Sequence, residues 1–101
     1  MTLVQLRHLI SLADTASFSR AAERQHLTQP ALSRSIAALE DELGGRLFDR
    51  VGRRAEPTAL GREILARARR LVSEAEDLAG HGQAVRAGQR SEEHTSELQS
   101  R

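Results

Sequence analysis

The segment LTQPALSRSIAALEDELGG, residues 27–45, contains the start signal, the apolar stripe and the stop signal of a single helix. Thr28 can cap the first turn, and Pro30 lies in that turn, where a missing backbone N–H is tolerated. Gly44 is the expected left-handed C-cap. Between these signals, apolar side chains recur at helical spacing, at Leu32, Ile36, Leu39 and Leu43. A helix with one apolar face needs other elements to cover that face.

Two shorter helices are predicted ahead of this segment. Residues 2–15 place apolar side chains along one side of a helix, at Leu3, Leu6, Leu9, Ile10 and Ala13. In the following run, SFSRAAERQ, either Ser17 or Ser19 can cap a second helix that ends near Gln25. Phe18 is expected in the core. A short helix joined to the next by roughly three or four residues is the helix-turn-helix pattern.

A basic hairpin is predicted after the capped helix. Leu47 and Phe48 have strand character, and Gly52 with arginines on both sides of it indicates a hairpin turn. Pro57 ends the second short strand. We therefore expect residues 47–57 to form a two-stranded wing.

The helical period returns after Thr58 and predicts a long helix over residues 59–79. Its apolar stripe consists of Leu60, Ile64, Leu65, Ala68, Leu71, Val72, Ala75 and Leu78. No other predicted helix is long enough to cover this stripe, so we expect it to form a homodimer interface with a second copy. Further glycines then interrupt the pattern, at Gly80, Gly82 and Gly88.

The last residues, 90–101, share neither the Arg/Ala bias nor the periodicity of the preceding sequence. The run RSEEHTSELQS matches, residue for residue, the translation of a common sequencing-library adapter. We therefore treat residues 90–101 as a disordered read-through artefact and expect a different natural sequence after Gln89. A disordered acidic tail is the alternative interpretation.

The helix predicted over residues 28–43 has an unusual polar face. Opposite its apolar stripe lie Pro30, Ser33, Arg34, Ala37 and Asp41. The N-terminal half of this face has one arginine, short hydrogen-bonding groups and no acid, which suits the floor of a DNA major groove. A small-residue face more often packs against another protein, and a lone arginine is usually only solvated. The order of the elements, ending in a basic hairpin and a long helix, favours DNA.

The composition argues against several other classes of protein. There is no Cys, no Gly-rich phosphate loop and no metal-ligand spacing among the histidines, so we expect no enzymatic activity, metal or cofactor. Polar residues interrupt the Leu/Ile-rich N-terminus at helical spacing, which excludes a signal peptide or a membrane span and favours a cytoplasmic protein. The net charge is only +1, and all 15 basic residues are Arg, which a GC-rich genome largely explains.

Two runs of the sequence, LRHLISLADTASFSRAAERQHLTQPALSRSIAALEDELGGRLFDR and GRRAEPTALG, resemble the N-terminal domain of the LysR-type transcriptional regulators. The specific patterns are S-F-S-x-A-A, Q-P-A-L-S-x-x-I-x-x-L-E-x-x-L-G and L-F-x-R, and the resemblance covers residues 3–78. It implies a mainly α fold: a winged helix-turn-helix over residues 1–58, with three helices and a two-stranded wing, then a long dimerisation or linker helix over residues 59–79.

The resemblance also implies sequence-specific binding of double-stranded DNA by a dimeric bacterial regulator. The recognition helix, residues 28–43, would enter the major groove, and the wing would meet the adjacent minor groove or the backbone. The implied DNA-binding residues are two helix caps, Ser19 and Thr28; four groove-facing residues, Gln29, Pro30, Ser33 and Arg34, with Ser35 near their edge; and two wing residues, Arg53 and Arg54.

Family members normally continue into a domain that senses a small-molecule effector, and they act as tetramers. Residues 80–89 would then begin the connection to that domain, which this chain lacks. A dimer without the domain would occupy operators without responding to effector. A rival reading is a helical interaction module that heterodimerises through the long helix. The basic hairpin argues against it, because such a module has no need for arginines around a turn.

Overall fold

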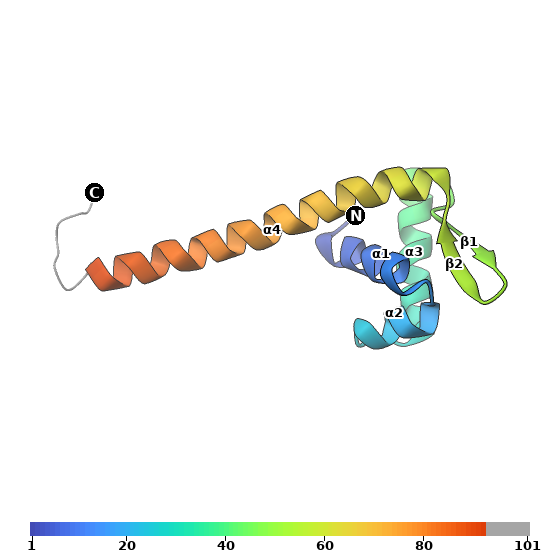
Figure 1. Cartoon of the computed structure of the whole chain (residues 1–101), viewed down its shortest axis with the longest axis horizontal. Coiled ribbons are helices and arrows are strands. Elements are labelled where there is room, and N and C mark those ends of the chain that lie inside the picture. The colour runs from blue at the N-terminus through green and yellow to red at the C-terminus, as the bar shows by residue number, and fades with distance from the viewer. Residues whose placement is uncertain (93–101) are drawn as a thin grey trace.

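The computed structural model describes residues 1–92, which form four α-helices and one antiparallel hairpin (Figure 1). The elements are α1 (Leu3–Thr15), α2 (Phe18–Arg24), α3 (Gln29–Leu43), β1 (Phe48–Val51), β2 (Arg54–Pro57) and α4 (Ala59–Glu92). The predicted order of three helices, a two-stranded wing and a long helix is confirmed. Of the proposed artefact at residues 90–101, residues 93–101 lie outside the described residues.

Side-chain caps fix where the first three helices begin. Thr2 Oγ1 accepts a hydrogen bond from the backbone N–H of Gln5 at 3.1 Å, and Gln5 Oε1 accepts one from the N–H of Thr2 at 3.0 Å. Such a reciprocal pair satisfies two otherwise unpaired donors at the start of α1. Ser17 caps α2 and Thr28 caps α3, each with a single hydrogen bond to its side-chain oxygen. These local bonds set the lengths of the connections between the helices.

The turn between α2 and α3 is tight. His26 has a left-handed backbone with φ of 57°, a conformation that non-glycine residues adopt mainly in turns. The other end of α3 is closed by Gly44, at φ of 79°, as the sequence predicts. The recognition helix α3 is therefore delimited by backbone geometry at both ends.

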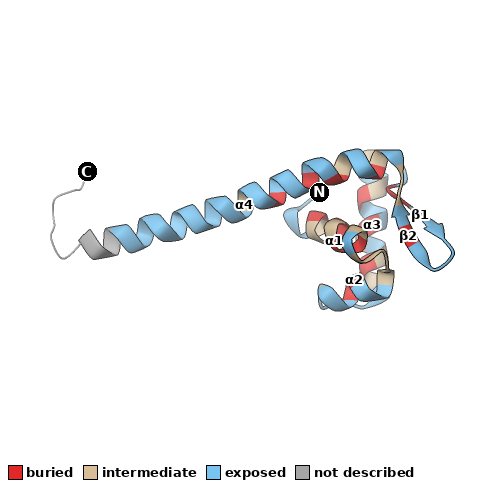
Figure 2. Cartoon of the chain, in the orientation of Figure 1, coloured by how far each residue is buried: buried red, intermediate tan, exposed pale blue. Residues whose placement is uncertain are grey.

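The core lies where α1, α2, α3, the hairpin and the first half of α4 meet (Figure 2). Its largest fully buried side chains are Leu9, Leu12, Leu32, Leu39 and Leu47. Each of the first three helices contributes one face to it, while the C-terminal half of α4 extends away into solvent. The buried stripe predicted for α3 is confirmed at Leu32, Ile36 and Leu39.

The expectation that no other helix covers the stripe of α4 is wrong for its first half. Leu65, Ala68 and Val72 are buried within the chain, and Leu60 and Ile64 pack against the same core. The reason is that α1 lies along α4. Of the predicted interface residues, Leu71 and Leu78 are exposed and Ala75 is half-buried.

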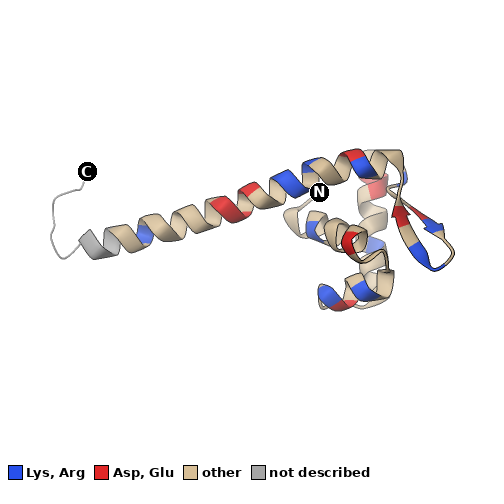
Figure 3. Ribbon diagram, viewed as in Figure 1, with Lys and Arg blue, Asp and Glu red and all other residues tan. Residues whose placement is uncertain are grey.

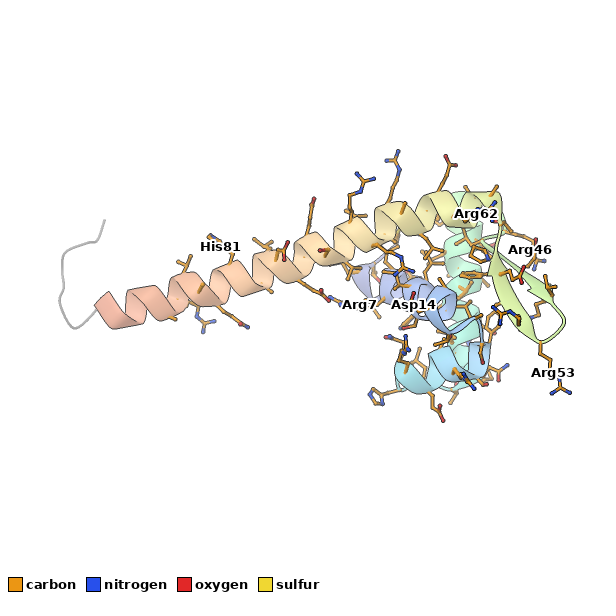
Figure 4. All side chains as sticks on the ribbon, viewed as in Figure 1. Arg7, Asp14, Arg46, Arg53, Arg62 and His81 are labelled. Carbon is orange, nitrogen blue, oxygen red and sulfur yellow. The ribbon has the colours of Figure 1, made fainter. Side chains whose placement is uncertain are left out.

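Two ion pairs hold α1 against α4. Arg7 Nη1 lies 2.8 Å from Glu76 Oε2, and Arg69 Nη2 lies 2.7 Å from Asp14 Oδ1. They link the second turn and the last turn of α1 to α4, and Figure 4 labels Arg7 and Asp14. Exposed pairs add little stability individually. Their effect here is to fix how far α1 lies along the longer helix.

The long helix does not end at residue 79 as predicted but continues to Glu92. A glycine in a helix interior costs about 1 kcal/mol relative to alanine, which weakens a helix without stopping it. A stop of the kind seen at Gly44 needs a positive φ, and Gly80, Gly82 and Gly88 do not have one. Residues 80–89, predicted as a connection, and residues 90–92, predicted as disordered, are therefore helical.

The wing is anchored to the helices at both of its ends. β1 and β2 pair antiparallel, with Phe48 opposite Pro57 and Val51 opposite Arg54. The Ala55 N–H donates to the Ala16 carbonyl at 2.9 Å, which joins β2 to the end of α1. At the other end, Thr58 Oγ1 donates to the Arg46 carbonyl at 2.6 Å and accepts from the Gly61 N–H at 3.0 Å. The hairpin is thus held in one direction relative to α3.

Candidate nucleic-acid interface

The first half of α3 presents an exposed surface without acidic side chains. Thr28, Gln29, Pro30 and Arg34 are exposed, and Ser33 is half-buried between them and the core. There is no acid in the first turn. The free backbone N–H groups and the positive end of the helix dipole favour an anion such as phosphate here. This surface can accept a negatively charged backbone and offers one guanidinium for a base edge.

The acidic residues of α3 lie at its opposite end, next to the start of α4 (Figure 3). Two of them have partners in the fold. Glu40 Oε2 accepts from the Leu47 N–H at 2.8 Å, and Glu42 Oε1 lies 2.8 Å from the N-terminal ammonium of Met1. The carboxylates that would repel DNA are thus kept away from the N-terminal half of the helix and serve to hold the following loop and the chain terminus.

Ser35 is half-buried at the edge of the exposed groove-facing residues, and a contact of its side chain with DNA stays a prediction. Its Oγ is 2.7 Å from Nδ1 of His8, which is buried on α1. On a helical wheel Ser35 lies at the boundary between the exposed and the buried face, about 100° from each neighbour. The sequence of α3 gives no signal for its direction, because the hydrogen-bond partner lies 27 residues away.

Ser19 is not a helix cap, which corrects the prediction that it caps α2. Ser17 caps α2, and its Oγ accepts from the Arg20 N–H at 3.2 Å. Ser19 follows in the first turn, exposed, with its Oγ 3.3 Å from that of Ser17. The sequence allowed either serine as the cap. Ser17 is the one used, because α2 begins at Phe18, whose side chain packs against the core. Thr28, by contrast, caps α3 as predicted, accepting from the Ala31 N–H at 3.2 Å.

Arg53 lies at the tip of the wing and points away from the body of the molecule (Figure 4). Gly52 precedes it with φ of 63°, so the turn has a positive φ only at its first central residue, as a type II′ turn requires. Within residues 1–92 Arg53 has no ion pair. Arg54 is held loosely, 3.9 Å from Glu56. The guanidinium at the tip is therefore available to a partner.

Arg50 has a structural role that the sequence did not reveal. Its guanidinium carbon lies 4.2 Å from the centre of the Phe18 ring, a cation–π contact between the wing and the start of α2. The sequence grouped Arg50 with the arginines of the hairpin tip. Because the contact joins residues 32 positions apart, no local pattern predicts it. It fixes the wing next to the helix-turn-helix.

Basic residues lie on α2 and along the hairpin, with a single arginine in the first half of α3, and a further group lies on the first half of α4 (Figure 3). Two other kinds of site are not found among residues 1–92. There is no group of three or more His, Asp or Glu placed to hold a metal ion. No helix in this part of the chain is long and apolar enough to cross a membrane.

The class of protein follows from this arrangement: a winged helix-turn-helix domain with a long helix appended, in which the start of the third helix and the hairpin tip are both exposed. The model for bacterial regulatory helix-turn-helix proteins of the lysR family matches residues 3–62, so the chain belongs to that family. The family predicted from the sequence is thereby confirmed.

Relatives of the chain are HTH-type and activator proteins. It is 54% identical over 77 residues to an uncharacterised HTH-type transcriptional regulator in the ibpB-leuC intergenic region of Azotobacter vinelandii, covering 76% of this chain and 54% of that protein. It is 57% identical over 70 residues to the SDS degradation transcriptional activation protein of a Pseudomonas species, covering 69% of this chain and 23% of that protein. The chain thus spans about half or less of the length of these curated relatives.

The fold also matches a solved structure that contains DNA. The crystal structure of the BenM DBD in complex with benA site 1 DNA superposes with a TM-score of 0.82 at 32% identity. The match covers 87% of this chain and 99% of that one. The similarity therefore extends over the helix-turn-helix, the wing and part of the long helix.

Proposed function

We propose that this chain binds double-stranded DNA sequence-specifically as a homodimer and regulates bacterial transcription. The observation that carries the proposal is the acid-free first half of α3, exposed next to a basic hairpin whose tip arginine has no ion pair within residues 1–92. The DNA in the BenM complex supports it, because that fold matches this one over most of the chain. We further propose that the chain is not an enzyme. A DNA partner would place the protein in the bacterial cytoplasm.

Base reading falls to the exposed residues at the start of α3. Arg34 has a planar guanidinium that can donate two hydrogen bonds to guanine in the major groove, and Gln29 can pair with adenine in a similar way. Thr28 and the N–H groups of the first turn would hold a phosphate. Arg53 and Arg54 would reach the adjacent backbone or minor groove, where a narrow groove attracts arginine.

The homodimer is proposed through the part of α4 that its own chain leaves uncovered. Leu71 is 49% exposed and Leu78 is 71% exposed, and together with Ala75 and Leu3 they line an apolar groove. The charges along this part of α4 change sign, from Arg67 and Arg70 to the acidic residues at positions 74–77. An antiparallel pairing of two copies would therefore set the basic part of each helix beside the acidic part of the other. The tetramer and the effector implied by the family stay predictions.

The test is selection of bound duplexes from a random DNA pool by the full chain, at low and at moderate salt. The proposal predicts an enriched inverted repeat with half-sites about one helical turn apart, about 34 Å between centres. Enrichment of a single half-site would retain base reading by α3 and overturn the dimer. Binding that enriches nothing and disappears as salt rises would reduce the chain to a non-specific phosphate binder and overturn the proposal.

A further inference from the structure

Two polar side chains are buried among the residues that the structure describes, and both belong to α1. They are His8, 8% exposed, and Ser11, 4% exposed. They lie three positions apart, on one face of the helix. His8 Nδ1 lies 2.7 Å from Ser35 Oγ on α3, and Ser11 Oγ accepts from Gln25 Nε2 at 2.6 Å in the turn after α2. Each buried polar group of α1 is thus bonded to a different part of the helix-turn-helix.

These hydrogen bonds supply a direction that the apolar contacts lack. Burial of leucine against leucine is non-directional, so an apolar core alone tolerates small rotations of one helix against another. A hydrogen bond weakens steeply as its angle changes. Ser35 directly follows Arg34, and neighbouring side chains on a helix are separated by about 100°. Holding Ser35 in one direction therefore also sets the direction of Arg34.

α1 also lies between the recognition helix and α4. It carries the ion pairs to α4, from Arg7 to Glu76 and from Asp14 to Arg69. A rotation of α3 relative to α1 would therefore be a rotation relative to α4, and in a dimer it would move the two recognition helices relative to each other. The contacts of His8 and Ser11 are in a position to control this angle.

We propose that His8 is a positioning residue for DNA recognition: its hydrogen bond to Ser35 fixes the rotation of α3, so that Arg34 meets one base position in each half-site. Ser11 supports it by holding the turn at Gln25. The proposal rests on the proposed function, since it concerns how the same surface discriminates between sequences. It adds a residue that does not touch DNA to those that determine specificity.

The experiment compares specific with non-specific affinity for the full chain. The wild-type chain first selects its site from the random pool, and the affinities of each variant for that site and for a scrambled duplex are then measured at several salt concentrations. His8→Leu removes the hydrogen bond and keeps an apolar side chain, whereas His8→Asn keeps a polar group near the position of Nδ1. Ser35→Ala removes the partner without changing the α1 core.

We expect His8→Leu and Ser35→Ala each to lower the ratio of specific to scrambled affinity about tenfold, with the scrambled affinity and its salt dependence unchanged. His8→Asn should restore most of the ratio, and the double variant should be no worse than either single one. If His8→Leu does not fold, Ser35→Ala and His8→Asn decide the matter in the same way.

An unchanged ratio in Ser35→Ala would overturn the proposal while leaving the proposed function intact. A parallel loss of specific and scrambled affinity would also overturn it, because it would show only a structural role for the bond. Failure of the wild-type chain to enrich any site would overturn the proposed function itself, and this inference with it.

Discussion

Arg34 and Arg53 are both exposed, but their backbones place them in different surroundings. Arg34 lies on the recognition helix among small polar residues, where a guanidinium can reach a base edge, whereas Arg53 lies at the tip of a hairpin. We expect Arg34→Ala to weaken specific binding by about 1–3 kcal/mol and to relax preference at one base position. Arg53→Ala should weaken binding to all sequences and lower the salt slope by about one unit.

Both variants can be compared on the selected site and on single-base variants of it, across a salt series. Arg86→Ala is a suitable control, since Arg86 is exposed on the C-terminal half of α4, away from α3 and the hairpin. A loss of sequence preference in Arg53→Ala, with Arg34→Ala unaffected, would invert the assignment of the two arginines.

His8 should also make stability depend on pH. Burial lowers the pKa of His8 below its ordinary value of 6.5. The unfolded chain therefore takes up a proton at His8 at higher pH than the folded chain does. The contribution of neutral His8 is complete above about pH 6.5 and is lost as the pH falls through the lowered pKa.

Urea denaturation of the wild type at about pH 7.5 and about pH 5.5 measures this effect, in a range where carboxylates stay ionised. We expect the free energy of unfolding to fall toward pH 5.5 in the wild type and to fall less in His8→Asn. The exposed His26 provides the matched control, and the free energy of unfolding should fall by the same amount toward pH 5.5 in His26→Asn as in the wild type. Equal losses in the wild type and in His8→Asn would refute the effect.

The glycines of α4 differ in their surroundings although they belong to one helix. A Cβ at Gly61 would collide with the backbone carbonyl of Leu47, at the place where α4 crosses the loop before the wing. A Cβ at Gly80 meets nothing within 4 Å. Gly61→Ala should therefore destabilise the chain by about 1–3 kcal/mol, because backbone has to move. Gly80→Ala should stabilise the helix by about 0.5–1 kcal/mol.

Thermal unfolding followed by circular dichroism compares these two variants directly. The same substitution in the same helix gives opposite signs if the packing at Leu47 is the cause. A destabilised Gly80→Ala would mean that the glycine serves a close contact with a partner, and a neutral Gly61→Ala would mean that α4 does not cross the loop this closely.

The elements that the sequence predicted well are those with local signals. Thr28, Pro30 and Gly44 specify the ends of α3 by short-range hydrogen bonds and backbone preferences, and both ends are observed. What could not be predicted depends on contacts between distant segments. The direction of Ser35 is set by His8, the position of Arg50 by Phe18, and the burial of Val72 by α1. The end of α4 at residue 79 was predicted wrongly from the glycines that follow, because the presence of a glycine does not reveal its φ.

The molecule as a whole has an exposed apolar surface that folding of one chain does not cover. Leu71, Leu78 and Val85 are exposed along α4, and Leu3 and Val4 are exposed at the start of α1. Isolated exposed leucines are ordinary, but several that line one groove indicate a protein contact. We therefore expect the chain to be dimeric at micromolar concentration, and dimerisation should stabilise it, so that its melting temperature rises with concentration.

Leu71→Glu tests whether this groove is the dimer contact, because it places a charge within the groove. Leu71 also borders the neighbouring basic part of α4. Ser73→Glu is the matched control, since it adds the same charge to an exposed position pointing about 200° away around the helix. Sedimentation equilibrium should show a monomer for Leu71→Glu and a dimer for Ser73→Glu and the wild type. The monomer should bind a single half-site weakly and lose its preference for the inverted repeat.

A Leu71→Glu chain that remains dimeric would place the contact elsewhere, and a Ser73→Glu chain that dissociates would assign the effect to charge on α4 in general.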